Sequence, residues 1–168
     1  SRFFRSINNL ITASQSIGSG NLIMAYVHVG HDSVIGNNTV LVNNVALAGH
    51  VNVGDWVILG GYTLVHQFCM IGPHAFTGMG TSVGKDIPAY MTASGAPAQV
   101  KTINSEGLRR RGFSSEVINE LRRAYKIIYR QGLTIDIALE RLEDMLDQTP
   151  ELDLLIDSLR RSERGIVR

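Results

Sequence analysis

Four of the five histidines in this 168-residue sequence lie between residues 28 and 66, and an aspartate directly follows one of them. They are His28, His31, His50 and His66, and the aspartate is Asp32. A neutral imidazole can accept a proton from a hydroxyl group near neutral pH, and an adjacent carboxylate can orient it and stabilise the imidazolium. The group therefore predicts a general base, provided that the fold brings these residues together.

A period of six residues governs the first half of the chain. In steps of six from residue 17 to residue 83, eleven of twelve positions are aliphatic, and eight of the twelve positions that follow them are glycine. A short, strict period is typical of a parallel β-helix, in which each hexapeptide is one strand and a corner. The aliphatic residue points inward, and the small residue after it permits a turn where a side chain would clash.

Three hexapeptides complete one coil, so residues eighteen apart stack about 4.8 Å from one another. This register predicts one edge of the β-helix that carries the histidines on neighbouring coils. A backbone N–H at Gly49 could stabilise a developing oxyanion there, because no side chain blocks its approach. The expected columns are His31, Gly49 and Gln67; Asp32, His50 and Phe68; His28, Ala46 and Leu64; and Gly30, Ala48 and His66.

Other interpretations of these histidines remain open. Three histidines on adjacent coils could bind zinc with an open coordination position, although Gln67 and Asp32 do not complete an obvious ligand set. Any single histidine could be structural, which we favour for His74. The β-helix could also be a non-catalytic scaffold, since parallel β-helices pack well side by side.

The composition of the chain changes near residues 90–103. Residues 1–100 hold three basic and three acidic side chains, whereas residues 101–168 hold 13 and 12. Charged, Leu- and Ile-rich sequence with apolar residues at helical spacing predicts helices. The fold class is therefore mainly β plus α. We expect an atypical segment over 1–15, a parallel β-helix over 16–90, a linker over 91–103 and a helical domain over 104–168.

Cap residues place four helices in the second half. The first covers residues 104–111 and ends at Gly112. The others begin after Ser114 or Ser115, after Thr134, and after Thr149, with Pro150 at the first helical position. They run towards residues 131, 147 and 161.

The run Arg109, Arg110 and Arg111 admits two interpretations. It could be a solvated helix end, where cations complement the helix dipole. It could also bind phosphate, because the guanidinium fork matches phosphate oxygens, with Asn104 and Glu106 offering partners for a base or ribose. Nucleic acid is not an expected partner, because the net charge is +1 and no aromatic residues interleave the run.

Composition also limits the cellular setting. One cysteine cannot form an internal disulfide, and no apolar run approaches the roughly 18–20 residues of a membrane helix. The first residues lack the apolar core of a signal peptide. We expect a cytoplasmic protein without stable membrane insertion.

Several segments resemble the acyl-[acyl-carrier-protein]–UDP-N-acetylglucosamine O-acyltransferases, which perform the first committed step of lipid A synthesis in Gram-negative bacteria. The resemblance covers about residues 16–168 and is carried by NLIMAYVHVGHD (21–32), LAGH (47–50), VHQF (65–68), NSEGLRRRGF (104–113) and SERGIVR (162–168). It implies a left-handed β-helix with a helical C-terminal domain, in a homotrimer with active sites between subunits. It also implies transfer of an (R)-3-hydroxyacyl group from acyl carrier protein to the 3-hydroxyl of UDP-N-acetylglucosamine. No metal or organic cofactor is implied, because the acyl-acyl carrier protein is a co-substrate.

The resemblance also implies roles for individual residues. His31 is similar to the general base, Asp32 to its orienting partner, and the Gly49 N–H to the oxyanion donor. Met79 stands where many members have glycine at the floor of the acyl groove, which predicts a chain nearer ten carbons than fourteen. The implied sugar and acyl-pantetheine wall is His28, His50, His66 and Gln67, and the implied nucleotide-binding set is Asn104, Glu106, Arg110 and Arg111.

The chain departs from the family pattern at its N-terminal end. Family members carry several more N-terminal coils, and residues 1–15 break the six-residue phase. We therefore expect an N-terminally truncated family member. The alternatives are an inactive remnant or trimeric scaffold, and the related glucosamine N-acyltransferase, against which the 104–111 motif and the helical tail argue.

Overall fold

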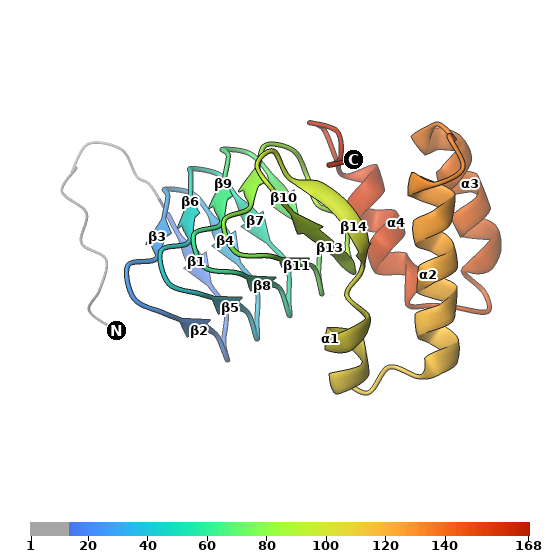
Figure 1. The fold of residues 1–168 in the computed structure, drawn as a ribbon, viewed down its shortest axis with the longest axis horizontal. Coiled ribbons are helices and arrows are strands. Elements are labelled where there is room, and N and C mark those ends of the chain that lie inside the picture. The colour runs from blue at the N-terminus through green and yellow to red at the C-terminus, as the bar shows by residue number, and fades with distance from the viewer. Residues whose placement is uncertain (1–13) are drawn as a thin grey trace.

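The computed structural model describes residues 14–168; of the atypical segment expected over 1–15, residues 1–13 lie outside the described part. Short strands wind into a three-sided coil, and four helices stand at one end of it (Figure 1). The predicted fold class, a left-handed parallel β-helix followed by an α-helical domain, is confirmed.

Twelve two-residue strands alternate with corners, one strand for each hexapeptide. Each of the first nine strands pairs in parallel with the strand eighteen residues later, as Ser16 pairs with Val34, so the predicted register is confirmed. The first face holds β1 (Ser16–Ile17), β4 (Val34–Ile35), β7 (Asn52–Val53) and β10 (Met70–Ile71). The second holds β2 (Leu22–Ile23), β5 (Val40–Leu41), β8 (Ile58–Leu59) and β11 (Phe76–Thr77). The third holds β3 (His28–Val29), β6 (Ala46–Leu47), β9 (Leu64–Val65) and β12 (Ser82–Val83).

Glycine follows the buried aliphatic residue because adjacent coils approach closely at that point. A Cβ atom on Gly30 would lie 2.4 Å from the carbonyl carbon of Ala48 on the next coil. The turn itself comes two residues later, where every sixth residue from Gly20 to Gly80 has φ near +60°. Most of these positions carry side chains, including Asp32 and His50. A left-handed conformation costs such a residue ~1 kcal/mol, so the inter-coil hydrogen bonds must hold it in place.

Residues 91–103 are not a linker, and that prediction is wrong. They form an antiparallel pair, β13 (Met91–Ser94) and β14 (Gln99–Ile103), and β13 extends the second face by pairing with β11. Met91, Ala93 and Ile103 are buried. The hairpin therefore continues the core of the coil after the six-residue phase has ended.

The four predicted helices are present as α1 (Ser105–Arg110), α2 (Ser115–Tyr129), α3 (Ile135–Met145) and α4 (Leu152–Arg160). Side chains of Asn104, Ser114 and Thr134 cap the first three by accepting a backbone hydrogen bond. The predicted cap at Thr149 is wrong, because α4 begins after Glu151 without a side-chain cap bond. Within residues 14–168, no helix combines the length and apolarity that a membrane span requires.

One continuous hydrophobic core joins the helices to the end of the coil. The C-terminal tail returns to the coil, where Asp86 N–H donates to the Gly165 carbonyl at 3.0 Å and Val167 N–H donates to the Asp86 carbonyl at 2.8 Å. The change in composition near residues 90–103 is thus accompanied by a change of secondary structure within one packed unit.

Candidate active site

His31, Asp32 and His50 meet at one corner of two adjacent coils. His31 Nδ1 lies 2.8 Å from Asp32 Oδ2, and His50 Nε2 lies 3.8 Å from the same oxygen. The two imidazole rings meet edge to face with their centroids 5.0 Å apart. The eighteen-residue register therefore does assemble the imidazole–carboxylate cluster that the spacing predicted.

Asp32 fixes the tautomer of His31. The hydrogen bond from His31 holds the pKa of Asp32 below its ordinary value, and a bond from the Ser14 backbone N–H acts the same way. The ionised carboxylate accepts the proton on Nδ1, which leaves Nε2 with a free lone pair. Because the His31 side chain is 62% exposed, that lone pair is open to a substrate.

Gly49 lies directly against the His31 ring. A Cβ atom at Gly49 would lie 2.6 Å from His31 Nε2, so only glycine leaves room for the imidazole. At another corner, the N–H groups of Ser19 and Asn37 donate to side-chain oxygens of Asn37 and Asp55 on the next coil, at 2.8 and 2.7 Å. Among residues 14–168 the Gly49 N–H has no such acceptor. The Gly49 backbone, with its N–H unpaired among these residues, therefore lies beside the Nε2 atom of His31.

The other residues that are expected to contact the sugar and the acyl-pantetheine lie along the same edge of the β-helix. His28, His66 and Gln67 are exposed, and His66 Nδ1 lies 3.2 Å from the Gln67 carbonyl oxygen. His50 stacks on Phe68 with ring centroids 4.6 Å apart, which fixes the plane of the imidazole. The eighteen-residue register predicts that Phe68 stacks in the same column as Asp32 and His50. Its residue type alone did not indicate a function.

The expected nucleotide-binding residues lie around α1. Glu106 is exposed, and it pairs with Arg109 and with Arg110 Nε at 3.0 Å. The Asn104 amide is engaged within the protein, because Nδ2 donates to the His74 carbonyl at 3.0 Å and Oδ1 caps α1. The structure thus gives Asn104 a positioning role and leaves Glu106 and Arg110 facing solvent.

Arg111 is anchored on an aromatic stack. Its Nη1 donates to His74 Nδ1 at 3.1 Å, and its guanidinium lies 5.5 Å from the centre of the Trp56 ring. His74 is buried between Trp56 and Tyr90, at centroid distances of 6.3 and 5.5 Å, in agreement with a structural role. The stack occupies a different corner from His31, and its member His74 lies more than two coils further along the chain. One chain therefore does not bring Arg111 to the imidazole cluster.

His74 is expected to make the protein sensitive to mild acid. Burial, reinforced by the charge of Arg111, lowers the pKa of His74 to about 4. The unfolded chain therefore binds a proton that the folded chain does not, and stability is lost as the pH falls from about 6.5 towards 4. Between pH 7 and pH 5 this amounts to about 2 kcal/mol in the free energy of unfolding, measurable by urea titration.

Two variants separate this effect from general acid instability. His74→Phe keeps an aromatic ring in the stack and should remove most of the loss, whereas His28→Phe, at an exposed position, should retain it. If the free energy of unfolding depends equally on pH in both variants, a group other than His74 is responsible for the loss of stability in acid.

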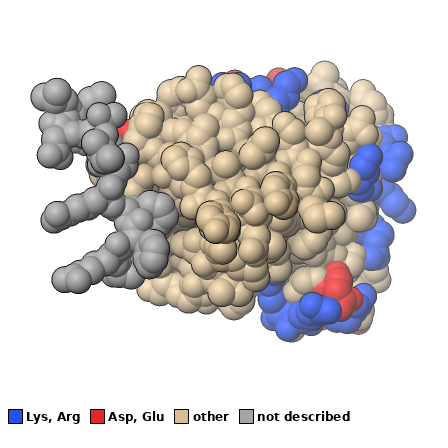
Figure 2. Space-filling view, turned by 60° about the vertical axis from the view of Figure 1, so that its left-hand side comes forward, with Lys and Arg blue, Asp and Glu red and all other residues tan. Residues whose placement is uncertain are grey.

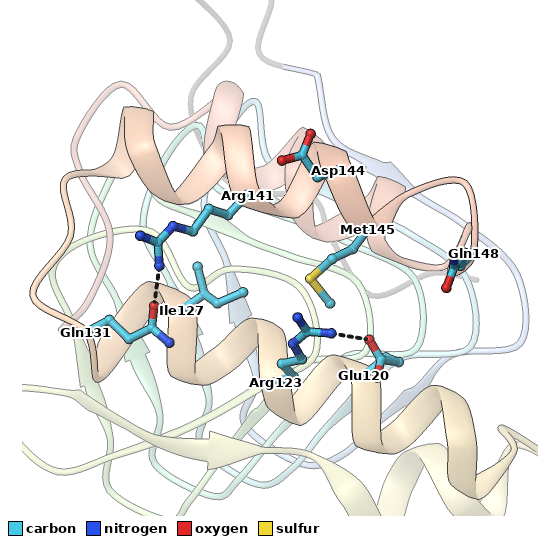
Figure 3. A pocket seen from close by; sticks show the side chains of 8 residues that line it. All are labelled: Glu120, Arg123, Ile127, Gln131, Arg141, Asp144, Met145 and Gln148. Carbon is cyan, nitrogen blue, oxygen red and sulfur yellow. Dashed lines mark hydrogen bonds and ion pairs between the residues drawn. The ribbon is translucent and has the colours of Figure 1, made fainter.

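A hollow between α2 and α3 lies apart from this edge (Figure 3). Its two arginines are already paired, since Arg141 donates to Gln131 at 2.8 Å and Arg123 lies 3.6 Å from Glu120. Each arginine of the hollow therefore already has a polar partner within it.

Only one group within residues 14–168 has the donors for a metal ion. The candidate ligand atoms of His31, Asp32 and His50 all lie within 4.8 Å of one another. The zinc interpretation of the sequence invoked three histidines, whereas the structure assembles two histidines and the carboxylate.

Comparisons with known proteins agree with this architecture. The model of the family "Udp N-acetylglucosamine O-acyltransferase; Domain 2" matches residues 86–167, and the bacterial transferase hexapeptide model matches residues 16–49. An acyl-[acyl-carrier-protein]–UDP-N-acetylglucosamine O-acyltransferase of Pseudomonas entomophila is 63% identical over 91% of this chain and 59% of its own length.

Solved structures show the same relationship. LpxA from Acinetobacter baumannii is 48% identical with a TM-score of 0.89, over 90% of this chain and 59% of its own. The UDP-N-acetylglucosamine O-acyltransferase from Moraxella catarrhalis is 44% identical with a TM-score of 0.90, over 92% and 60%. The chain thus spans about three fifths of the length of these relatives. By sequence and by fold, it belongs to the family of acyl-[acyl-carrier-protein]–UDP-N-acetylglucosamine O-acyltransferases.

Proposed function

We propose that this chain transfers an (R)-3-hydroxyacyl group from acyl carrier protein to the 3-hydroxyl of UDP-N-acetylglucosamine, with His31 as the general base. The observation that carries the proposal is the hydrogen bond between His31 Nδ1 and Asp32, which turns Nε2 towards Gly49, whose N–H has no acceptor among residues 14–168. The relatives are named as acyltransferases that act on acyl carrier protein and UDP-N-acetylglucosamine, which supports these substrates.

The geometry supports direct transfer. His31 Nε2 takes the proton of the sugar hydroxyl as its oxygen attacks the thioester carbonyl carbon. The carbonyl oxygen becomes an oxyanion that the Gly49 N–H stabilises, while the Asp32 carboxylate stabilises the imidazolium. Collapse of the intermediate breaks the carbon–sulfur bond, and the imidazolium returns its proton to the departing thiolate.

The positions of the binding residues support a homotrimer. Glu106, Arg110 and Arg111 would bind the nucleotide, but they lie far from His31 in one chain, so a neighbouring copy would complete the site. The coil offers a broad face without charged side chains, while charges gather at the helical end (Figure 2). Leu64 and Phe68, both more than half exposed, provide apolar surface beside the histidines.

An assay on the folded chain tests the proposal. The chain is mixed with 3-hydroxyacyl-acyl carrier protein and UDP-N-acetylglucosamine, and released thiol and acylated sugar nucleotide are measured together. Equal amounts of the two products support the transferase. Acylation only of a glucosamine acceptor with a free amine would favour the N-acyltransferase, and a folded trimer without activity would favour the scaffold.

Met79 is expected to set the acyl-chain length. It is 81% exposed at the far edge of the third face from His31, roughly 13 Å further along the axis of the coil. A flexible thioether there would fill the space that the end of a longer chain needs. Met79→Gly should shift the ratio of kcat/KM for ten- and fourteen-carbon donors towards the longer one; an unchanged ratio would refute this role.

A further inference from the structure

We propose that the corner formed by His31, Asp32 and His50 is also a binding site for a divalent transition-metal ion, and for zinc in particular. We further propose that the bound ion stops acyl transfer. Only this second statement rests on the proposed function, because the first concerns the three side chains alone.

The geometry fits a zinc site with three protein ligands. Zinc binds nitrogen and oxygen donors at about 2.0–2.2 Å in a tetrahedron, which places donors roughly 3.3–3.6 Å apart. The distances from Asp32 Oδ2 to His31 Nδ1 and to His50 Nε2, 2.8 and 3.8 Å, bracket that separation. The three ligand atoms lie within 4.8 Å of one another, so small side-chain rotations suffice.

The surrounding structure orients the donors before an ion arrives. The Ser14 N–H occupies Oδ1 of Asp32 at 3.1 Å, so Oδ2 is directed to the imidazoles. Phe68 fixes the ring of His50 by stacking, and the backbone N–H of His50 donates to the His31 carbonyl at 2.8 Å. Imidazole with carboxylate suits zinc far better than magnesium. Because both histidines are exposed, a fourth coordination position remains for water.

A bound ion would remove the base in either coordination mode. Coordination at Nδ1 displaces the proton shared with Asp32, and the neutral ring then carries its proton on Nε2. Coordination at Nε2 occupies the lone pair that would accept the hydroxyl proton. In both modes His31 no longer accepts a proton from the sugar.

Direct titration with zinc chloride tests the binding site without any substrate. Calorimetry or competition with a chromophoric chelator should show one zinc ion per chain. We expect His50→Ala and Asp32→Asn to weaken the affinity at least tenfold. His66→Ala is the matched control: it removes an exposed histidine of the same edge and should leave the affinity unchanged. Magnesium should not compete.

Circular dichroism confirms that each variant is folded. Absence of zinc binding, or equal affinity in all four proteins, would overturn the site. The second statement is tested by acyl transfer at increasing zinc occupancy: inhibition should follow occupancy and be reversed by chelator. Zinc binding without inhibition of an active enzyme would overturn the second statement, whereas zinc binding by an inactive chain would count against the proposed function alone.

Discussion

Replacement of His31 by alanine is expected to lower kcat for acyl transfer by about 100- to 10,000-fold, the contribution typical of a positioned general base. The ring proposed to accept the hydroxyl proton is lost, while the residues proposed to bind the nucleotide at the helical end are untouched, so KM should change little. Steady-state assays with saturating donor and acceptor measure both constants.

Thermal unfolding provides the control for this variant. The His31 side chain is 62% exposed, so its removal should leave the midpoint of unfolding almost unchanged. A folded His31→Ala protein that retains kcat within a few-fold of the wild type would rule out His31 as the base.

Replacement of Gly49 by alanine is expected to lower kcat at least ~100-fold, although it adds a single methyl group. The new Cβ atom would lie 2.6 Å from His31 Nε2 and 2.7 Å from Cε1, so the ring must swing away. That movement breaks the bond to Asp32 and separates the lone pair from the Gly49 N–H. The same kinetic assay measures the effect.

Gly61→Ala is the matched control, because a Cβ atom there meets only ordinary contacts at 3.5 Å or more. It should behave like the wild type. The double variant His31→Ala/Gly49→Ala should be little worse than His31→Ala, since the methyl group acts mainly by displacing the ring. Additive losses would mean that Gly49 acts independently of His31.

The sequence predicted the coil and its histidine edge because a fixed period converts chain distance into spatial distance. Positions 31, 49 and 67 must stack once three hexapeptides make a coil, whatever their side chains. The helices were predictable for a similar reason, since caps at Ser114 and Thr134 are local signals that depend on a few consecutive residues.

Two of the missed features depend on contacts that follow no period. Residues 91–103 leave the six-residue phase, and their strands become apparent only when β11 is present to pair with β13. The anchoring of Arg111 on His74 joins a helix end to a corner 37 residues earlier. Trp56 stands eighteen residues before His74, so the register could have revealed their stacking, but no residue type pointed to it.

The pH dependence of kcat/KM in the wild type and in His31→Ala tests the central claim most directly. Asp32 should remain ionised over the pH range of this assay, because the hydrogen bond from His31 holds the pKa of Asp32 below its ordinary value. The account predicts that wild-type kcat/KM falls tenfold per pH unit in acid, because the group that accepts the hydroxyl proton must itself be unprotonated. The residual activity of His31→Ala should be flat over the same range. An acid limb that persists unchanged in His31→Ala would contradict the assignment of His31 as the group that accepts the proton.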